Sequence, residues 1–238
     1  MWTRTVKGLL LTFHLAGINN QNFLMRDDQT GSFWQQVSGR AISGPLAGSQ
    51  LELVYNDELT FRLWRKLAPG GTVLVPVARY VPEYETRDWD TRMAKTKTVL
   101  DFPKTPLKSR DLVLGLELRG ASRAYEVSRV LRETLVLDSV GGEPVLLAVG
   151  PDGKSIRAFR ARLDDGEAPE FFRKTNSSTV DAKAPLFIDS QTGTEWNFDG
   201  CPVRGKYAGR CLALVPVLKD YWFDWRNYNP STTVYGRR

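Results

Sequence analysis

Histidine and cysteine are almost absent from this chain, whose 238 residues include one histidine, His14, and two cysteines. Zinc and iron–sulfur sites draw heavily on these two residue types, and no Cys-x-x-Cys pair is present. A serine or cysteine nucleophile activated by a histidine base would have only His14 to use. We therefore expect no metal, no cofactor and no histidine-based catalytic centre.

Long apolar runs are missing as well. No stretch approaches the roughly 20 apolar residues of a membrane helix. The first five residues have no basic segment leading into an apolar run, so no signal peptide is visible. We expect a soluble chain without a membrane span, cytoplasmic as given, and exported only if the natural start lies upstream of Met1.

Neither positive nor negative charge strongly dominates. The 33 basic residues outnumber the 27 acidic ones, for a net charge of +6. The basic residues are scattered rather than gathered into one stripe, and this argues against nucleic-acid binding.

One motif, in contrast, is present twice. Asp-x-x-Thr-Gly-x-x-Trp occupies residues 27–34 and again residues 189–196, an offset of 189 − 27 = 162. One residue is then dropped, and the match resumes at an offset of 161. The later matches include Gly39/Gly200, Leu51/Leu212, Trp64/Trp225, Pro69/Pro230 and Thr72/Thr233. So many pairs in one register predict two related, pseudo-symmetric halves.

The motif itself predicts a hairpin in each half. Strand-like runs at 23–26 and 32–35, and at 186–188 and 194–196, flank the Asp-x-x-Thr-Gly segments. An aspartate that opens a turn accepts hydrogen bonds from backbone N–H groups just ahead, and the glycine supplies a positive φ. Turn chemistry thus explains Asp27 and Asp189, and it favours a structural role over a catalytic one.

Further elements follow in both halves. A second hairpin joins residues 40–43 to residues 50–54, which alternate polar and apolar side chains. Short helices with apolar and aromatic residues on one face are predicted at 57–67 and 220–228, each ended by a proline, and β-branched strands follow at 72–75 and 232–235. The second half also has predicted strands at 112–118, 123–127, 135–138, 145–149 and 155–160, and a short helix at 128–133.

These elements predict a mainly β fold with a few short helices, built as two pseudo-symmetric halves of antiparallel hairpins, each closed by a short aromatic helix. We assign residues 1–76 to the first half, 77–110 to a connecting segment and 111–238 to the second half, all packed as one compact unit. The counterpart of residue 112 would fall at 112 − 161 = −49. The first half therefore starts midway, either because it is naturally shorter or because the coding start lies upstream.

Candidate ligand-binding residues lie where the two copies differ. The first copy has three asparagines before its hairpin, where the second copy has Asp181, Ala182 and Ala184. After Trp34 it has two glutamines, where the second copy has Asn197 and Phe198. These amides could bind a polar ligand or satisfy loop backbone groups, and both interpretations stay open. His14, on the polar face of a predicted strand, and Asp224, in the aromatic segment 221–228, complete the set. The candidates are His14, Asn19, Asn20, Asn22, Gln35, Gln36 and Asp224.

The two cysteines flank a predicted hairpin loop at 205–209. Cys201 and Cys211 lie almost symmetrically about it, so a cross-strand disulfide is geometrically feasible. Two separate reduced thiols are the alternative, and the lack of a visible secretion signal favours it.

Several longer motifs point to a known family. They are Phe-His-Leu-Ala-Gly-Ile-Asn-Asn-Gln-Asn at 13–22, Gly-Pro-Leu-Ala-Gly at 44–48, Val-Leu-Gly at 113–115, Arg-Ala-Tyr at 123–125, Gly-Gly-x-Pro-Val at 141–145 and Tyr-Trp-Phe-Asp-Trp at 221–225. With the doubled motif they make nearly the whole chain resemble the DUF3179 family of bacterial proteins, which has no assigned function. Members often carry a Cys-Pro-x-Cys-Gly segment and many look exported. In the first half this segment would precede Met1, and the corresponding place in the second half reads Gly-Pro-Asp-Gly-Lys at 150–154. We therefore expect any thiol or metal chemistry of the family to be absent here.

Two classes of function remain. The first is a non-enzymatic binding or interaction module for a polar small molecule, a saccharide or a protein partner. The second is a hydrolase or lyase that uses carboxylates and amides in a cleft between the halves, for instance Asp27 with Asp224. The missing histidine, cysteine and metal constellation favours the first.

Overall fold

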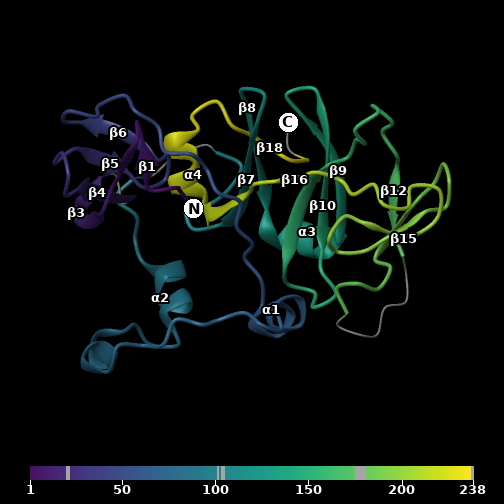
Figure 1. Ribbon diagram of the computed structural model, residues 1–238, viewed down its shortest axis with the longest axis horizontal. Helices are drawn as coiled ribbons and strands as arrows, with labels where there is room; N and C mark the ends of the chain where they lie inside the picture. The colour runs from purple at the N-terminus through teal and green to yellow at the C-terminus, as the bar shows by residue number, and fades with distance from the viewer. Residues whose placement is uncertain (20–21, 101, 103–104, 175–180, 237–238) are drawn as a thin grey trace.

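The structure, a computed structural model, describes residues 1–19, 22–100, 102, 105–174 and 181–236. It is mainly β, as the sequence predicts, with a row of small sheets and a few short helices (Figure 1). The strand pairs of the described residues are antiparallel, many of them hairpins, except for one parallel pair near the C-terminus. No helix in the described part of the chain is long and apolar enough to cross a membrane.

The N-terminal sheet is a meander at one end of the row. It has the order β3-β4-β5-β6 and is preceded by a small hairpin of β1 and β2. Trp34 is fully buried and packs edge-to-face on Phe13 at its centre. The strands are β1 (Thr5–Val6), β2 (Leu9–Leu10), β3 (Phe13–Asn19), β4 (Asn22–Asp27), β5 (Phe33–Gln35) and β6 (Arg40–Ser43).

The strand predicted over 50–54 is not formed. Only isolated bridges join Gln50 to Arg40 and Leu53 to Trp2. The polar–apolar alternation instead reflects Leu51, which is buried in the core of the N-terminal sheet while its neighbours are exposed.

Two four-stranded sheets form the middle of the molecule and pack face to face. The first has the order β17-β7-β8-β18 and the second β16-β11-β10-β9. Alternation along β7 divides its side chains: Leu114 and Leu116 face the second sheet, while Val113 and Gly115 face helix α4. The elements are β7 (Leu112–Leu118), β8 (Ala121–Glu126), α3 (Val127–Glu133), β9 (Leu135–Val140), β10 (Glu143–Val149), β11 (Ile156–Arg160), β16 (Leu214–Val215), β17 (Leu218–Tyr221), α4 (Trp222–Tyr228) and β18 (Thr233–Val234).

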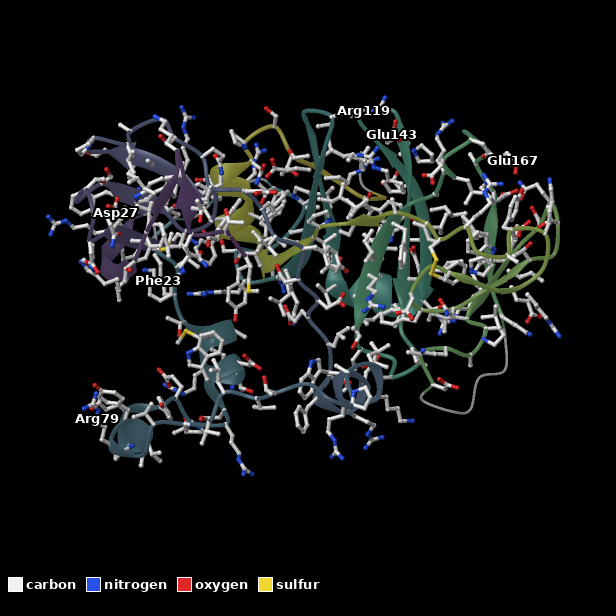
Figure 2. The ribbon with its side chains drawn as sticks, viewed as in Figure 1. Phe23, Asp27, Arg79, Arg119, Glu143 and Glu167 are labelled. Carbon is white, nitrogen blue, oxygen red and sulfur yellow. A yellow bond between two sulfur atoms is a disulfide. The ribbon has the colours of Figure 1, made fainter. Side chains whose placement is uncertain are left out.

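The far end of the row carries the second copy of the motif. Its sheet has the order β12-β13-β14-β15, with strands β12 (Phe171–Arg173), β13 (Phe187–Asp189), β14 (Glu195–Trp196) and β15 (Pro202–Arg204). Cys201 and Cys211 are joined by a disulfide, visible as the yellow bond in Figure 2. The expectation of two reduced thiols was therefore wrong. The loop between them brings the two Cα atoms to 4.1 Å, within bonding reach.

The connecting segment runs below the row of sheets in Figure 1 and is largely exposed. It contains two short helices that were not predicted, η1 (Ala78–Glu83) and α2 (Trp89–Lys95). Before it lies α1 (Phe61–Leu67), which is shorter than predicted because Thr60 caps its N-terminus. The β-branched run at 72–75 is exposed and pairs with no described strand, contrary to the prediction.

Helices α1 and α4 each contact a part of the molecule that is distant in the sequence. Leu63 of α1 lies in the core cluster that holds Phe187 and Trp196 of the second motif. Conversely, Asp224 of α4 accepts a hydrogen bond from Asn22 of the N-terminal sheet. Glu58 and Lys219, which are related by the offset of 161, form an ion pair with each other.

Candidate functional site

The aspartate of each motif copy, Asp27 or Asp189, accepts hydrogen bonds from its own hairpin. Thr30 donates to Asp27 from its backbone N–H at 2.6 Å and its hydroxyl at 2.9 Å, and Trp34 Nε1 donates at 2.8 Å. The second copy repeats these bonds from Thr192 and Trp196 to Asp189. Burial alone would raise the pKa of Asp27, but the hydrogen bonds outweigh it and lower that pKa.

Asp27 therefore lies inside the N-terminal sheet, as labelled in Figure 2, with its carboxylate occupied by its own turn. The sequence hypothesis paired it with Asp224. In the structure Asp224 contacts Asn22 and a different acid, Asp220. The turn geometry explains why: both oxygens of Asp27 are needed to close the hairpin around Trp34.

The amide of Asn22 links the N-terminal sheet to α4. Its Oδ1 accepts a hydrogen bond from the backbone N–H of Val37 at 3.1 Å, so its Nδ2 is directed toward Asp224 Oδ2 at 3.2 Å. Because the oxygen is already used, the amide can present only a donor to the carboxylate. Asn22 thus fixes one oxygen of Asp224 at the boundary between the N-terminal sheet and α4.

Asp220 and Asp224 form a carboxyl pair at this boundary. Asp224 is buried, with 6% of its surface exposed, and Asp220 is half-buried. Oδ1 of Asp224 accepts no hydrogen bond from any described residue. Burial, and then the negative charge of Asp224, raise the pKa of Asp220 to about 7, and burial raises the pKa of Asp224.

The carboxyl pair consequently retains a proton at a pH where ordinary aspartates have lost theirs. The two carboxyl groups are hydrogen-bonded to each other, and such a bond requires a proton on one of them. No described lysine or arginine forms an ion pair with either group. The site can therefore hold and release a proton near neutral pH, or accept a positively charged group in its place.

A tyrosine near the carboxyl pair is bonded to the N-terminal sheet. The hydroxyl of Tyr228, at the end of α4, donates to the backbone oxygen of Asn19 at 3.1 Å and is hydrogen-bonded to Gln35. Gln35 Oε1 accepts from Ser38, which leaves its amide nitrogen for Tyr228. Burial and the charge of Asp224 raise the pKa of Tyr228, so it stays a neutral donor.

The predicted site residues thus fall into two groups. Asn19, Asn22, Gln35 and Asp224 lie at this boundary. His14 lies elsewhere, exposed and 2.8 Å from Asp28, and Gln36 is exposed with its backbone oxygen bonded to Trp2. Asn20 lies outside the described residues.

Sequence reasoning missed Asp220, although a signal for it existed. In the register of 161, Asp220 corresponds to Leu59 and Asp224 to Leu63. Leu63 is fully buried and Leu59 packs against the same apolar cluster. The fold therefore accepts two leucines at these positions, and the second half replaces both with acids. Buried carboxyl groups that a fold does not require are typical of functional sites.

The geometry defines a mainly β protein with a carboxyl pair where α4 meets the N-terminal sheet. The chain belongs to the DUF3179 family, described as a protein of unknown function, whose model matches residues 1–232. No curated protein and no solved structure gives a significant match.

Proposed function

We propose that the protein is a non-enzymatic binding module and that the carboxyl pair, Asp220 with Asp224, receives a cationic or N–H-donating group of a small polar ligand. The observation that carries this proposal is the pair of acids at positions where the first half has leucines. A buried Oδ1 of Asp224 without a hydrogen-bond donor supports it, because buried acceptors are normally satisfied.

The surrounding groups favour recognition over turnover. Asn22 and Tyr228 already bond to backbone groups and are not free to move protons, and Asn22 also holds Asp224 in place. Among the described residues no group of three or more histidines, cysteines or acids could hold a metal ion. A small organic cation, which needs only one or two anionic partners, fits this arrangement better than a metal that requires a full coordination shell.

A second candidate is a hydrolase or lyase that uses the carboxyl pair for general acid–base catalysis. The specific observation is the pKa of Asp220, raised to about 7, because catalytic acids and bases work best near the ambient pH. In this case the pair would exchange its proton with a substrate instead of holding a ligand.

Stabilisation of the folded protein by a ligand distinguishes the binding module from the enzyme. The thermal unfolding of the purified protein would be measured at pH 8 with methylammonium, guanidinium or Ca²⁺. The same measurement would be made on an Asp220→Leu/Asp224→Leu variant, which has the leucines found at the matching positions of the first half. A probe present at one hundred times its Kd should stabilise the native protein by about 2.7 kcal/mol. The variant should show no such shift, and an Asp90→Asn variant of the exposed α2 helix serves as the matched control.

Two outcomes would count against binding at the pair. One is a shift of equal size in the double-leucine variant. The other is the absence of any shift together with turnover of chromogenic ester, glycoside or phosphate substrates that rises and falls about pH 7 and disappears in Asp220→Asn, which would favour the enzyme.

A further inference from the structure

A buried glutamate lies on the outer face of the sheet β12-β13-β14-β15, at the end of the row opposite the N-terminal sheet (Figure 1). Trp196 of β14 lies in the core, so its strand neighbour Glu195 is on the other face of the sheet. Cross-strand pairing places Ile188 of β13 on one side of Glu195 and Arg204 of β15 on the other. Glu195 is nevertheless only 5% exposed. A charge this buried requires partners that compensate it.

Two basic side chains share one oxygen of this carboxylate. Lys174 Nζ and Arg204 Nη2 each donate a hydrogen bond to Oε1 of Glu195 at 2.6 Å. The bonds from Arg204 and then Lys174 hold the pKa of Glu195 below its usual range, so the group is an anion at neutral pH. Each bond uses one N–H of a head group that has several. Because the side chains of Lys174 and Arg204 are 35% and 72% exposed, the cluster offers further N–H donors to the solvent.

The second oxygen of the carboxylate has no partner. Oε2 of Glu195 is buried and accepts no hydrogen bond from any described residue. Buried acceptors are normally satisfied, and leaving a charged one without a donor is costly. The cluster therefore combines cationic donors open to the solvent with an anionic acceptor that lacks a donor.

The first copy of the motif has different residues at these positions. Glu195 corresponds to Phe33 at the offset of 162, and Arg204 corresponds to Ser43 at the offset of 161. The strands nevertheless pair alike, because Phe33 of β5 lies opposite Ser43 of β6 as Glu195 lies opposite Arg204. This hairpin thus forms without the charged groups. Buried charge that a fold does not require is typical of functional sites.

We propose that Lys174, Glu195 and Arg204 form an anion site for a small oxyanion that also carries a hydroxyl group, of which monohydrogen phosphate is the simplest example. The oxyanion accepts hydrogen bonds from Lys174 and Arg204, and its hydroxyl donates to Oε2 of Glu195. The ligand reaches this buried oxygen by turning Arg204 aside, and such rotamer changes are fast for an exposed side chain. The anion site is separate from the carboxyl pair and does not depend on the function proposed for it.

The unpaired oxygen of Glu195 determines the selectivity of the anion site. Monohydrogen phosphate has an O–H that can donate to Oε2, whereas sulfate at neutral pH has only acceptor oxygens. Sulfate would therefore place one of its oxygens against a carboxylate, and a repulsive contact of this kind excludes a competitor of similar size and charge. A site whose buried polar group needs a hydrogen bond rejects the analogue that cannot make it. A patch of surface cations alone would not distinguish the two anions.

Isothermal titration calorimetry on the 238-residue protein at pH 8 and constant ionic strength tests this selectivity. Two matched pairs of anions are titrated: phosphate against sulfate, and glycolate against acetate. We expect the hydroxyl-bearing anion of at least one pair to bind at least about tenfold more tightly than its match. A preference within the first pair assigns the site to phosphate, and a preference within the second assigns it to hydroxy acids.

Three variants examine the roles of the charged groups. Lys174→Ala and Arg204→Ser, the latter introducing the residue of the first copy, should each weaken binding of the preferred anion about tenfold. Lys154→Ala, which removes an exposed cation from a turn elsewhere, is the matched control and should leave binding unchanged.

Glu195→Gln tests the selectivity itself. The glutamine has nearly the same shape, and its amide nitrogen can donate a hydrogen bond from the position of Oε2. Sulfate should then bind as tightly as phosphate, to within about twofold. The proposal is overturned if neither hydroxyl-bearing anion is preferred by the native protein, if folded Glu195→Gln keeps the preference, or if Lys154→Ala weakens binding as much as Lys174→Ala.

Discussion

The carboxyl pair predicts an unusual dependence of stability on pH. An unfolded aspartate loses its proton near pH 3.8, whereas folded Asp220 keeps its proton to about pH 7. Between these values the folded chain binds more protons than the unfolded chain, so the free energy of unfolding falls as pH rises. Above pH 7 both states have lost the proton and the contribution becomes constant.

The size of the effect follows from the shift. About three pH units at 1.36 kcal/mol per unit give an upper bound of about 4 kcal/mol. Water reaches part of Asp220, so we expect roughly 2 kcal/mol of stability to be lost between pH 5 and pH 8. Asp27, Asp57 and Asp152 have lowered pKa values, and their stabilisation is lost only as pH falls below about 4. These three aspartates therefore do not contribute to the change in stability between pH 5 and pH 8, which we assign to the carboxyl pair.

Urea unfolding at pH 5, 6, 7 and 8 measures the slope directly. In the Asp220→Leu/Asp224→Leu variant the slope should vanish and stability at pH 8 should exceed that of the native protein by about 1–4 kcal/mol, as for other buried charges replaced by apolar groups. Leu59→Asp is the reverse experiment and should introduce a similar slope into the first half. A native protein whose stability is constant or rises from pH 5 to 8, or a double variant with an unchanged slope, would refute the reasoning.

Two further predictions concern packing and covalent links. Gly115→Ala should destabilise the protein by about 1–3 kcal/mol because its Cβ meets the ring of Trp225, whereas Gly70→Ala, with nothing within 4 Å, should change stability by less than about 0.5 kcal/mol; equal urea midpoints would contradict this. Cys201→Ser opens the short loop closed by Cys211 and should lower the unfolding free energy by about 2–3 kcal/mol, and dithiothreitol should lower that of the native protein equally. Two free thiols titrated in the native protein would contradict the disulfide.

Local patterns predicted much of the fold. The turn chemistry of Asp-x-x-Thr-Gly located β4, β5, β13 and β14, and the strand predicted at 112–118 has the bounds of β7, Leu112–Leu118. Such signals depend on neighbours a few residues apart. The run at 72–75 has the composition of a strand but lacks a partner, and composition alone cannot supply one.

The candidate site was only partly predictable. Comparison of the copies singled out Asn22 and Asp224, which the fold brings together across 202 residues. Asp220 was not predicted because an acid at the start of an aromatic helix is common in a sequence. Its importance depends on its burial next to Asp224 and on the leucine, Leu59, at the matching position of the first copy.

The ion pair between Glu58 and Lys219 joins the segment just before α1 to strand β17. Both side chains are too exposed for the pair to add much stability, and salt screens an exposed pair. The attachment of α1 to the rest of the molecule therefore depends mainly on the apolar packing of Leu63, Leu59 and Leu67, which salt does not screen.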